Sequence, residues 1–169
     1  MGPHVGGTPA APQRPRSDTG LAHRLTDWMD NTAAPTTMQG SPMSTFHKVV
    51  LYTDTDGRAR FRDDSVPLTE GKPEARLSPL MPSGGYQLRH SPVGFRSAFH
   101  CTPQPQWVFI LAGQMEIGLQ DGSTRVFGPG EHFYSADLLP AGATFDASQH
   151  GHCSRQLGPQ PLVTLFLRD

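Results

Sequence analysis

Three polar side chains in one stretch of the chain, His100, Thr102 and Gln106, could act together in chemistry. Residues i and i+2 of a strand point to the same face, so His100 and Thr102 share a face of one expected strand. Gln106 begins the next expected strand, and a third strand carries His150 and His152. Imidazole suits several divalent transition metals. Side chains distant in sequence could therefore converge inside one folded domain.

The stretch from Gly94 to Gly113 resembles the first motif of the cupin family. That motif is Gly, five residues, His-x-His, three or four residues, Glu, six residues, Gly. The spacing of this chain matches at every position, with His100 as the first histidine. Thr102 stands in place of the second histidine, and Gln106 replaces the glutamate.

A second cupin motif is matched more loosely. It contains a Pro-x-Gly turn, then a histidine after two residues and an asparagine three residues later. Pro140-Ala141-Gly142 resembles the turn, but Phe145 occupies the histidine position. His152 keeps the family's spacing to Gln156, which replaces the asparagine, so a loop insertion before His152 accounts for the longer distance. The resemblance covers about residues 78–167.

This resemblance implies a jelly-roll barrel with a divalent metal held by three imidazoles and one carboxylate. Carried to this chain, it implies His100 and His152 as metal ligands, Gln106 as a weak ligand or an anchor for water, and Thr102 as a nearby donor. A hydroxyl and a neutral amide are poor ligands beside imidazole and carboxylate. His150 could supply a third imidazole, because it shares a strand face with His152 by alternation.

Two functions stay open. The first is metal-dependent chemistry on a small organic molecule, as in an oxygenase, isomerase or hydrolase, and the retained histidines favour it. The second is a metal-free barrel that binds a small ligand without catalysis, and the lost carboxylate favours it. Whether the chain is an enzyme, and which metal it would use, stays open, and a purely structural role is the alternative for each histidine.

An anionic substrate could be bound by arginine. Arg89, Arg96 and Arg155 are candidates, although ordinary surface charge is the alternative for each of them. Arg96 shares the His100 face by alternation. Arg96 and Thr102 are therefore the predicted substrate-binding residues.

The elements that must position these residues are short strands. Apolar runs beyond residue 43 alternate with turn signals about every ten residues, a pattern typical of a sandwich or barrel. No helical crossovers are expected between them, so the sheet should be mainly antiparallel. The expected strands are Phe46–Thr53, Ala59–Arg62, Ala75–Leu80, Tyr86–Ser91, Phe95–Thr102, Gln106–Leu111, Gln114–Leu119, Ser123–Phe127, His132–Ala136, His150–Gln156 and Leu162–Leu167. The sequence thus predicts one all-β, cupin-type jelly-roll barrel over residues 43–169.

Residues 1–42 differ in composition from the rest of the chain. They contain six prolines and five glycines, but their one aromatic residue is Trp28. Such a segment buries too little apolar area to offset the entropy of ordering it, so we expect a disordered tail. It could also be an artefact of the assigned start, with translation beginning at Met43. A short helical stripe from Leu21 to Met29 leaves a docking peptide as the third alternative.

The composition of this 169-residue chain limits the classes of partner that we expect it to bind. Lys+Arg 14 against Asp+Glu 15 provides no basic surface for nucleic acid or for an anionic membrane. No apolar run approaches the roughly 18 residues of a membrane span. The two cysteines, Cys101 and Cys153, fit a reducing compartment. We therefore expect a cytoplasmic protein with a small-molecule ligand, and a homodimer formed through exposed edge strands.

Overall fold

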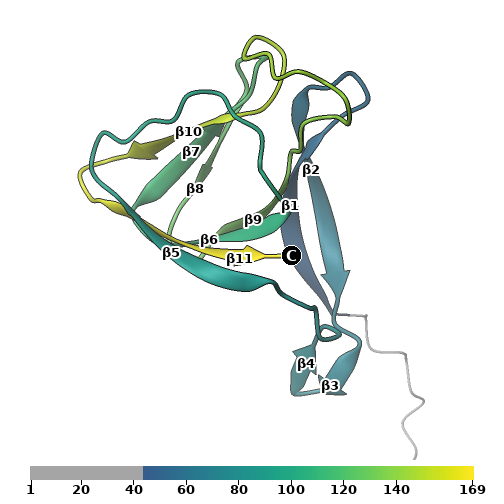
Figure 1. Ribbon diagram of the computed structural model, residues 1–169. Helices are drawn as coiled ribbons and strands as arrows, with labels where there is room; N and C mark the ends of the chain where they lie inside the picture. Colours follow the sequence, from purple (N-terminus) through teal and green to yellow (C-terminus); the bar gives the residue numbers. More distant parts are fainter. Residues whose placement is uncertain (1–43) are drawn as a thin grey trace, which may run out of the picture. The chain divides into compact units, whose positions relative to one another are not determined.

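The computed structural model describes residues 44–169, and every regular element in that range is a strand (Figure 1). The all-β prediction is therefore confirmed. None of the described residues forms a helix that could cross a membrane. The strands are β1 (Thr45–Thr53), β2 (Ala59–Pro67), β3 (Glu70–Lys72), β4 (Ala75–Leu77), β5 (Gly85–Ser91), β6 (Gln106–Ala112), β7 (Gln114–Gly118), β8 (Thr124–Phe127), β9 (His132–Ala136), β10 (Cys153–Leu157) and β11 (Leu162–Arg168).

Two sheets and one hairpin make up the domain. The large sheet has the strand order β2-β1-β9-β6-β11-β5, the small sheet has the order β10-β7-β8, and β3 pairs with β4. β1 and β9 run parallel, and the other paired strands run antiparallel. The sheets are therefore mainly antiparallel, as expected. Between residues 44 and 169 the two sheets stay separate, and no closed barrel forms.

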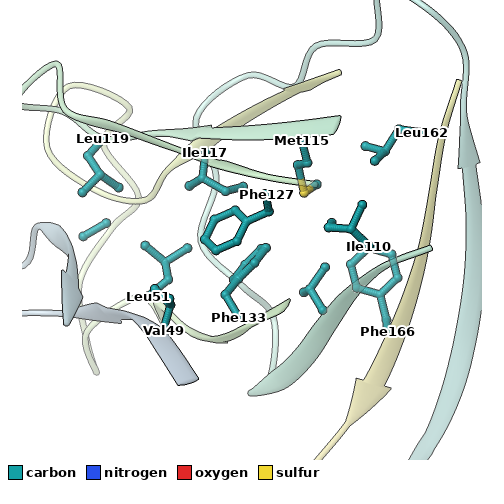
Figure 2. Packing of buried hydrophobic residues seen from close by; sticks show 12 residues of the cluster. Val49, Leu51, Ile110, Met115, Ile117, Leu119, Phe127, Phe133, Leu162 and Phe166 are labelled. Carbon is teal, nitrogen blue, oxygen red and sulfur yellow. The ribbon is translucent and has the colours of Figure 1, made fainter. Parts of the chain in front are cut away.

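The hydrophobic core lies between the two sheets (Figure 2). On β6, Val108 and Ile110 point into it, because alternate residues of a strand share a face. Met115 and Ile117 of β7 meet them from the small sheet. Phe133 of β9 is 2% exposed, and its ring centroid lies 4.7 Å from that of Phe127 on β8. The core thus joins the two sheets.

Four of the expected strands form differently. The strand expected at Ala59–Arg62 continues to Pro67 as β2, and the strand expected at Ala75–Leu80 ends at Leu77 as β4. The segment Phe95–Thr102 is no regular strand and makes only isolated bridges to the β10 side, at Arg96 and His100. The strand expected from His150 begins at Cys153, because the His150 backbone N–H instead bonds Asp146 in a turn, at 2.7 Å. At His150 a local turn therefore takes the place of the expected strand. The disorder and the helical stripe predicted within residues 1–42 lie outside the described residues.

Candidate functional site

A cavity of about 360 Å³ opens between the large and small sheets. This volume falls at the lower end of the range for small-molecule pockets. Apolar side chains from both sheets, including Val108, Ile117 and Phe133, form its inner wall. Its polar lining residues are Gln87, Arg89, His100, Thr102, Gln106, Ser135, His152, Ser154 and Arg168. The cavity therefore combines apolar and polar side chains in its lining.

Four residues singled out from the sequence, His100, Thr102, Gln106 and His152, line this one cavity. They come from separate segments: Gln106 opens β6, His152 immediately precedes β10, and the other two belong to the irregular segment before β6. His152 is buried, whereas His100 is exposed at the cavity's edge. The loop insertion proposed before His152 is therefore compatible with its place beside His100.

The two histidines are brought together by a backbone bridge. The His100 amide donates to the His152 carbonyl at 2.9 Å, and the His152 amide donates back at 3.0 Å. The ring centroids lie 4.6 Å apart. Gly151 makes this approach available: its φ is +82°, and a Cβ there would lie 2.4 Å from the His100 carbonyl oxygen. Only glycine fits this position without a shift of the backbone.

Each imidazole is oriented through its Nδ1 atom. His152 Nδ1 lies 2.8 Å from Asp137 Oδ2, and His100 Nδ1 lies 2.9 Å from the Ala98 carbonyl oxygen. An ionised carboxylate and a carbonyl only accept hydrogen bonds, so both Nδ1 atoms donate. In the neutral rings, Nε2 is then the acceptor, and none of the described residues bonds it. Both Nε2 atoms can therefore accept a bond from a ligand or bind a metal.

Asp137 is a site residue that the sequence reasoning missed. Its side chain is fully buried, and it accepts from His152 and from Thr53 Oγ1 at 2.8 Å. Its backbone carbonyl accepts from the Thr102 amide at 2.7 Å. The available signal was an acidic residue followed by Leu-Leu-Pro at the end of an apolar strand. A buried carboxylate behind an imidazole fixes the ring, as in metal sites and in general acid–base sites.

Partial desolvation of the ring lowers the pKa of His100 below its ordinary value of 6.5. The hydrogen bond to Ala98 and the nearby Asp137 act in the opposite direction, and electrostatic interactions with His152 and Arg89 lower the pKa further. His100 is therefore neutral at pH 7. Burial also raises the pKa of the Cys101 thiol to about 11, so this residue does not point to thiolate chemistry. Both cysteines are free.

Gln106 and Thr102 are already engaged by neighbours. Gln106 Oε1 accepts a hydrogen bond from Arg168 Nη1, and Arg168 Nη2 also donates to Gln87 Oε1 at 2.6 Å. Thr102 Oγ1 shares a 2.6 Å hydrogen bond with Ser135 Oγ. The amide oxygen expected as a weak metal ligand is thus directed to a guanidinium.

Two other predicted residues lie elsewhere. His150 is buried in the loop before β10, where its Nδ1 accepts from the Asp146 amide at 3.0 Å, and it does not line the cavity. The positive φ of Gly151 breaks the alternation that would have placed His150 beside His152.

Arg96 is exposed and also lies outside the cavity lining. Four positions separate Arg96 from His100, but their bridge partners Arg155 and His152 are three positions apart. This slip of one residue in register moves side chains to the opposite face. Arg89, the lesser candidate from the sequence, is the arginine among the three that lines the cavity.

The residues present do not match a four-ligand metal site. Within residues 44–169, no cluster of three or more His, Cys, Asp or Glu side chains is placed to hold a metal ion. The cavity lining has two imidazoles, two arginines and no carboxylate. The Asp137 carboxylate lies behind the ring of His152 and bonds its Nδ1.

Solved structures include chains that are similar to this one. No family model matches the chain. No curated protein matches it either. Among solved structures, the chain is similar to the cupin domain of Cnp3 from Schizosaccharomyces pombe, with a TM-score of 0.36 and 13% sequence identity. The match covers 74% of this chain and 84% of that domain. Cupins are the family that the sequence motifs resemble.

Proposed function

We propose that the chain binds a small organic molecule in the cavity between its sheets, without a resident metal. The observation that carries this proposal is the pair of imidazoles, His100 and His152. Each is held through Nδ1, lines the same 360 Å³ space and has an Nε2 atom without a hydrogen-bond partner among the described residues. Polar groups that converge on one cavity, beside apolar side chains such as Val108 and Phe133, are usual features of a ligand site.

The charge of the cavity favours an organic ligand over a metal cation. Arg89 and Arg168 line it together with the two imidazoles, and no acidic side chain among the described residues does so. A divalent cation would meet two guanidinium charges without a carboxylate to offset them. The engaged oxygen of Gln106 removes one further potential ligand.

A divalent transition metal held by His100 and His152 is the second candidate. The orientation of His152 by a buried carboxylate favours it, because metal-binding histidines commonly have such a partner. The cupin-type jelly roll is likewise a proposal for how this two-sheet arrangement should be classified.

Histidine-ring NMR with small organic fragments tests the proposed function. Neutral, anionic and cationic fragments are added in turn while the Cε1–H resonances of His100 and His152 are followed. We expect at least one class to shift both resonances. His90, exposed on β5 and absent from the cavity lining, serves as the internal control and should not move.

The same spectra distinguish the metal alternative. If no fragment moves the two rings while Zn²⁺ shifts both at stoichiometric concentration, and His100→Ala abolishes that response, the metal candidate replaces the proposal. If neither fragments nor Zn²⁺ act on these rings, the cavity is not a binding site.

A further inference from the structure

Arg89 lies in an unusual setting for a charged side chain. It projects from β5 into the cavity lining, with its guanidinium carbon 5.3 Å from the ring centroid of Phe95 and 4.8 Å from that of Phe166. Its Nε and Nη2 atoms are enclosed, and neither has a hydrogen-bond partner in the part of the chain that the structure describes. Nη1 is not enclosed in this way. Burial lowers the pKa of the side chain, which nevertheless stays protonated.

This arrangement leaves a positive charge without a counter-ion. Stacking on aromatic faces satisfies the flat sides of a guanidinium, but its N–H groups point outward in the plane and need acceptors. No carboxylate among residues 44–169 forms an ion pair with Arg89. A partly desolvated, unpaired cation is costly to the fold. An anion that enters the cavity would offset that cost.

The neighbouring groups point to the same kind of ligand. The positive charge of Arg168 also lines the cavity, and the Nε2 atoms of the two histidines can accept from a ligand hydroxyl or, when protonated, donate to an anion. Val108, Met115, Ile117 and Phe133 form the apolar part of the lining. The cavity thus offers cations and an apolar wall in one space.

We infer that the ligand of the cavity is a small carboxylate with an apolar body, and that Arg89 binds its carboxylate group. This inference rests on the proposed function, because it assigns the ligand class of the same cavity. Nη1 of Arg89 contacts the carboxylate, while the apolar body packs against Phe133 and its neighbours. Charge-assisted hydrogen bonds of this kind are stronger than bonds between neutral groups.

Calorimetric titration of the full chain with matched probes tests the inference. The probes are hexanoate and benzoate, each compared with its neutral amide, hexanamide or benzamide. We expect at least one acid to bind at least tenfold more tightly than its amide, a difference of about 1.4 kcal/mol. Equal affinity for acid and amide would overturn the carboxylate inference while leaving the proposed function intact. If neither acids nor amides bind and no fragment moves the histidine rings, the proposed function fails as well.

Substitution of Arg89 identifies the residue responsible. Arg89→Met keeps an unbranched apolar stem but removes the charge, so acid binding should fall at least tenfold and amide binding should stay unchanged. Arg58→Met is the matched control, because Arg58 is exposed in the turn between β1 and β2 and its loss changes the net charge equally. The affinity of Arg58→Met for hexanoate and benzoate should stay within twofold of that of the parent. Equal effects of the two substitutions would overturn the assignment to Arg89.

Thermal unfolding without ligand separates binding from a structural role. Because Arg89→Met removes an unpaired, partly buried charge, we expect the variant to melt at the same temperature as the parent or higher. A lower melting temperature together with unchanged acid binding would make Arg89 a packing residue for Phe95 and Phe166, and the inference would be wrong. If Arg89→Met does not fold, Arg89→Gln takes its place, because it also removes the charge, and the acid-to-amide comparison on the parent still decides the ligand class.

Discussion

At the scale of single residues, the chemistry of the cavity depends on how two imidazoles are held. The Ala98 carbonyl and the Asp137 carboxylate each fix one Nδ1 atom, and Nε2 of each ring has no hydrogen-bond partner among the described residues. Charge decides what can bind there, because Arg89 and Arg168 share the lining and a carboxylate does not.

The pH dependence of binding follows from the lowered pKa of His100. The charged or titratable groups that act on its ring are His152, Arg89 and Asp137. His100 is neutral at pH 7 and gains a positive charge only when the pH falls through its pKa, below 6.5. We therefore expect hexanoate affinity to rise as the pH falls from 7 toward that pKa, as measured by calorimetry.

The affinity for Zn²⁺ should change with pH in the opposite direction to that for hexanoate, because a metal competes with protons for Nε2. Affinity for Zn²⁺ should weaken over the same pH range. Hexanoate binding that weakens as the pH falls from 7 to 6 would contradict the charge argument.

Asp137 should contribute more to stability than an exposed acidic residue with ion pairs. Asp137→Ala leaves the His152 Nδ1–H without its acceptor in a buried site, so we expect a loss of about 1–3 kcal/mol in the free energy of unfolding. Asp63→Ala is the control: its side chain is 61% exposed despite contacts with His47 and Arg125, and its loss should cost less than about 0.5 kcal/mol. Urea denaturation measures both, and equal losses would argue against a special role for Asp137.

At the scale of elements, the site depends on a close backbone approach beside β10. Gly151→Ala puts a Cβ 2.4 Å from the His100 carbonyl oxygen, so the bridge between His100 and His152 must open. Gly142 is a matched control, because its φ is +77° but nothing lies within 4 Å of the added Cβ. We expect Gly142→Ala to cost about 1–2 kcal/mol from backbone strain alone and Gly151→Ala to cost clearly more.

The measurement is urea denaturation of the two variants, with the ring resonances of His100 and His152 followed by NMR. Only Gly151→Ala should alter both resonances. Similar losses of stability with unchanged rings would show that the close approach does not hold the two histidines together.

The sequence predicted the regular strands well and the irregular ones poorly. The strand expected at Gln106–Leu111 is observed as β6, which pairs with β11 on one side and with β9 on the other. Strand alternation misplaced Arg96, because the register slips by one residue between the bridges at Arg96 and His100, and no local sequence pattern marks such a slip. The spacing of the two motifs predicted that His100 and His152 come together. It did not predict the role of Asp137, whose partners His152 and Thr53 lie 15 and 84 positions away in the sequence.

At the scale of the whole molecule, the core cluster of the described residues extends from Val49 to Phe166. The composition of residues 1–42 predicts little buried apolar area, so their deletion should change the melting temperature by less than about 5 °C, a shift that corresponds to about 1 kcal/mol in a domain of this size. Differential scanning calorimetry of the full and shortened chains measures it. A larger fall would show that the segment packs on the domain, as a docking peptide would.

The homodimer stays a prediction. Edge strand β5 exposes Tyr86 and Leu88, at 71% and 65%, so it is the edge where such pairing would be expected.

The most direct test of a metal-free carboxylate site is one crystal structure of the full chain grown with hexanoate and Zn²⁺ and measured at the zinc absorption edge. We expect hexanoate density between the sheets, with a carboxylate oxygen about 3 Å from Arg89 Nη1 and the alkyl chain against Phe133. We also expect no anomalous peak between His100 and His152. An anomalous peak at the two Nε2 atoms, or hexanoate bound elsewhere with the cavity empty, would contradict a metal-free carboxylate site.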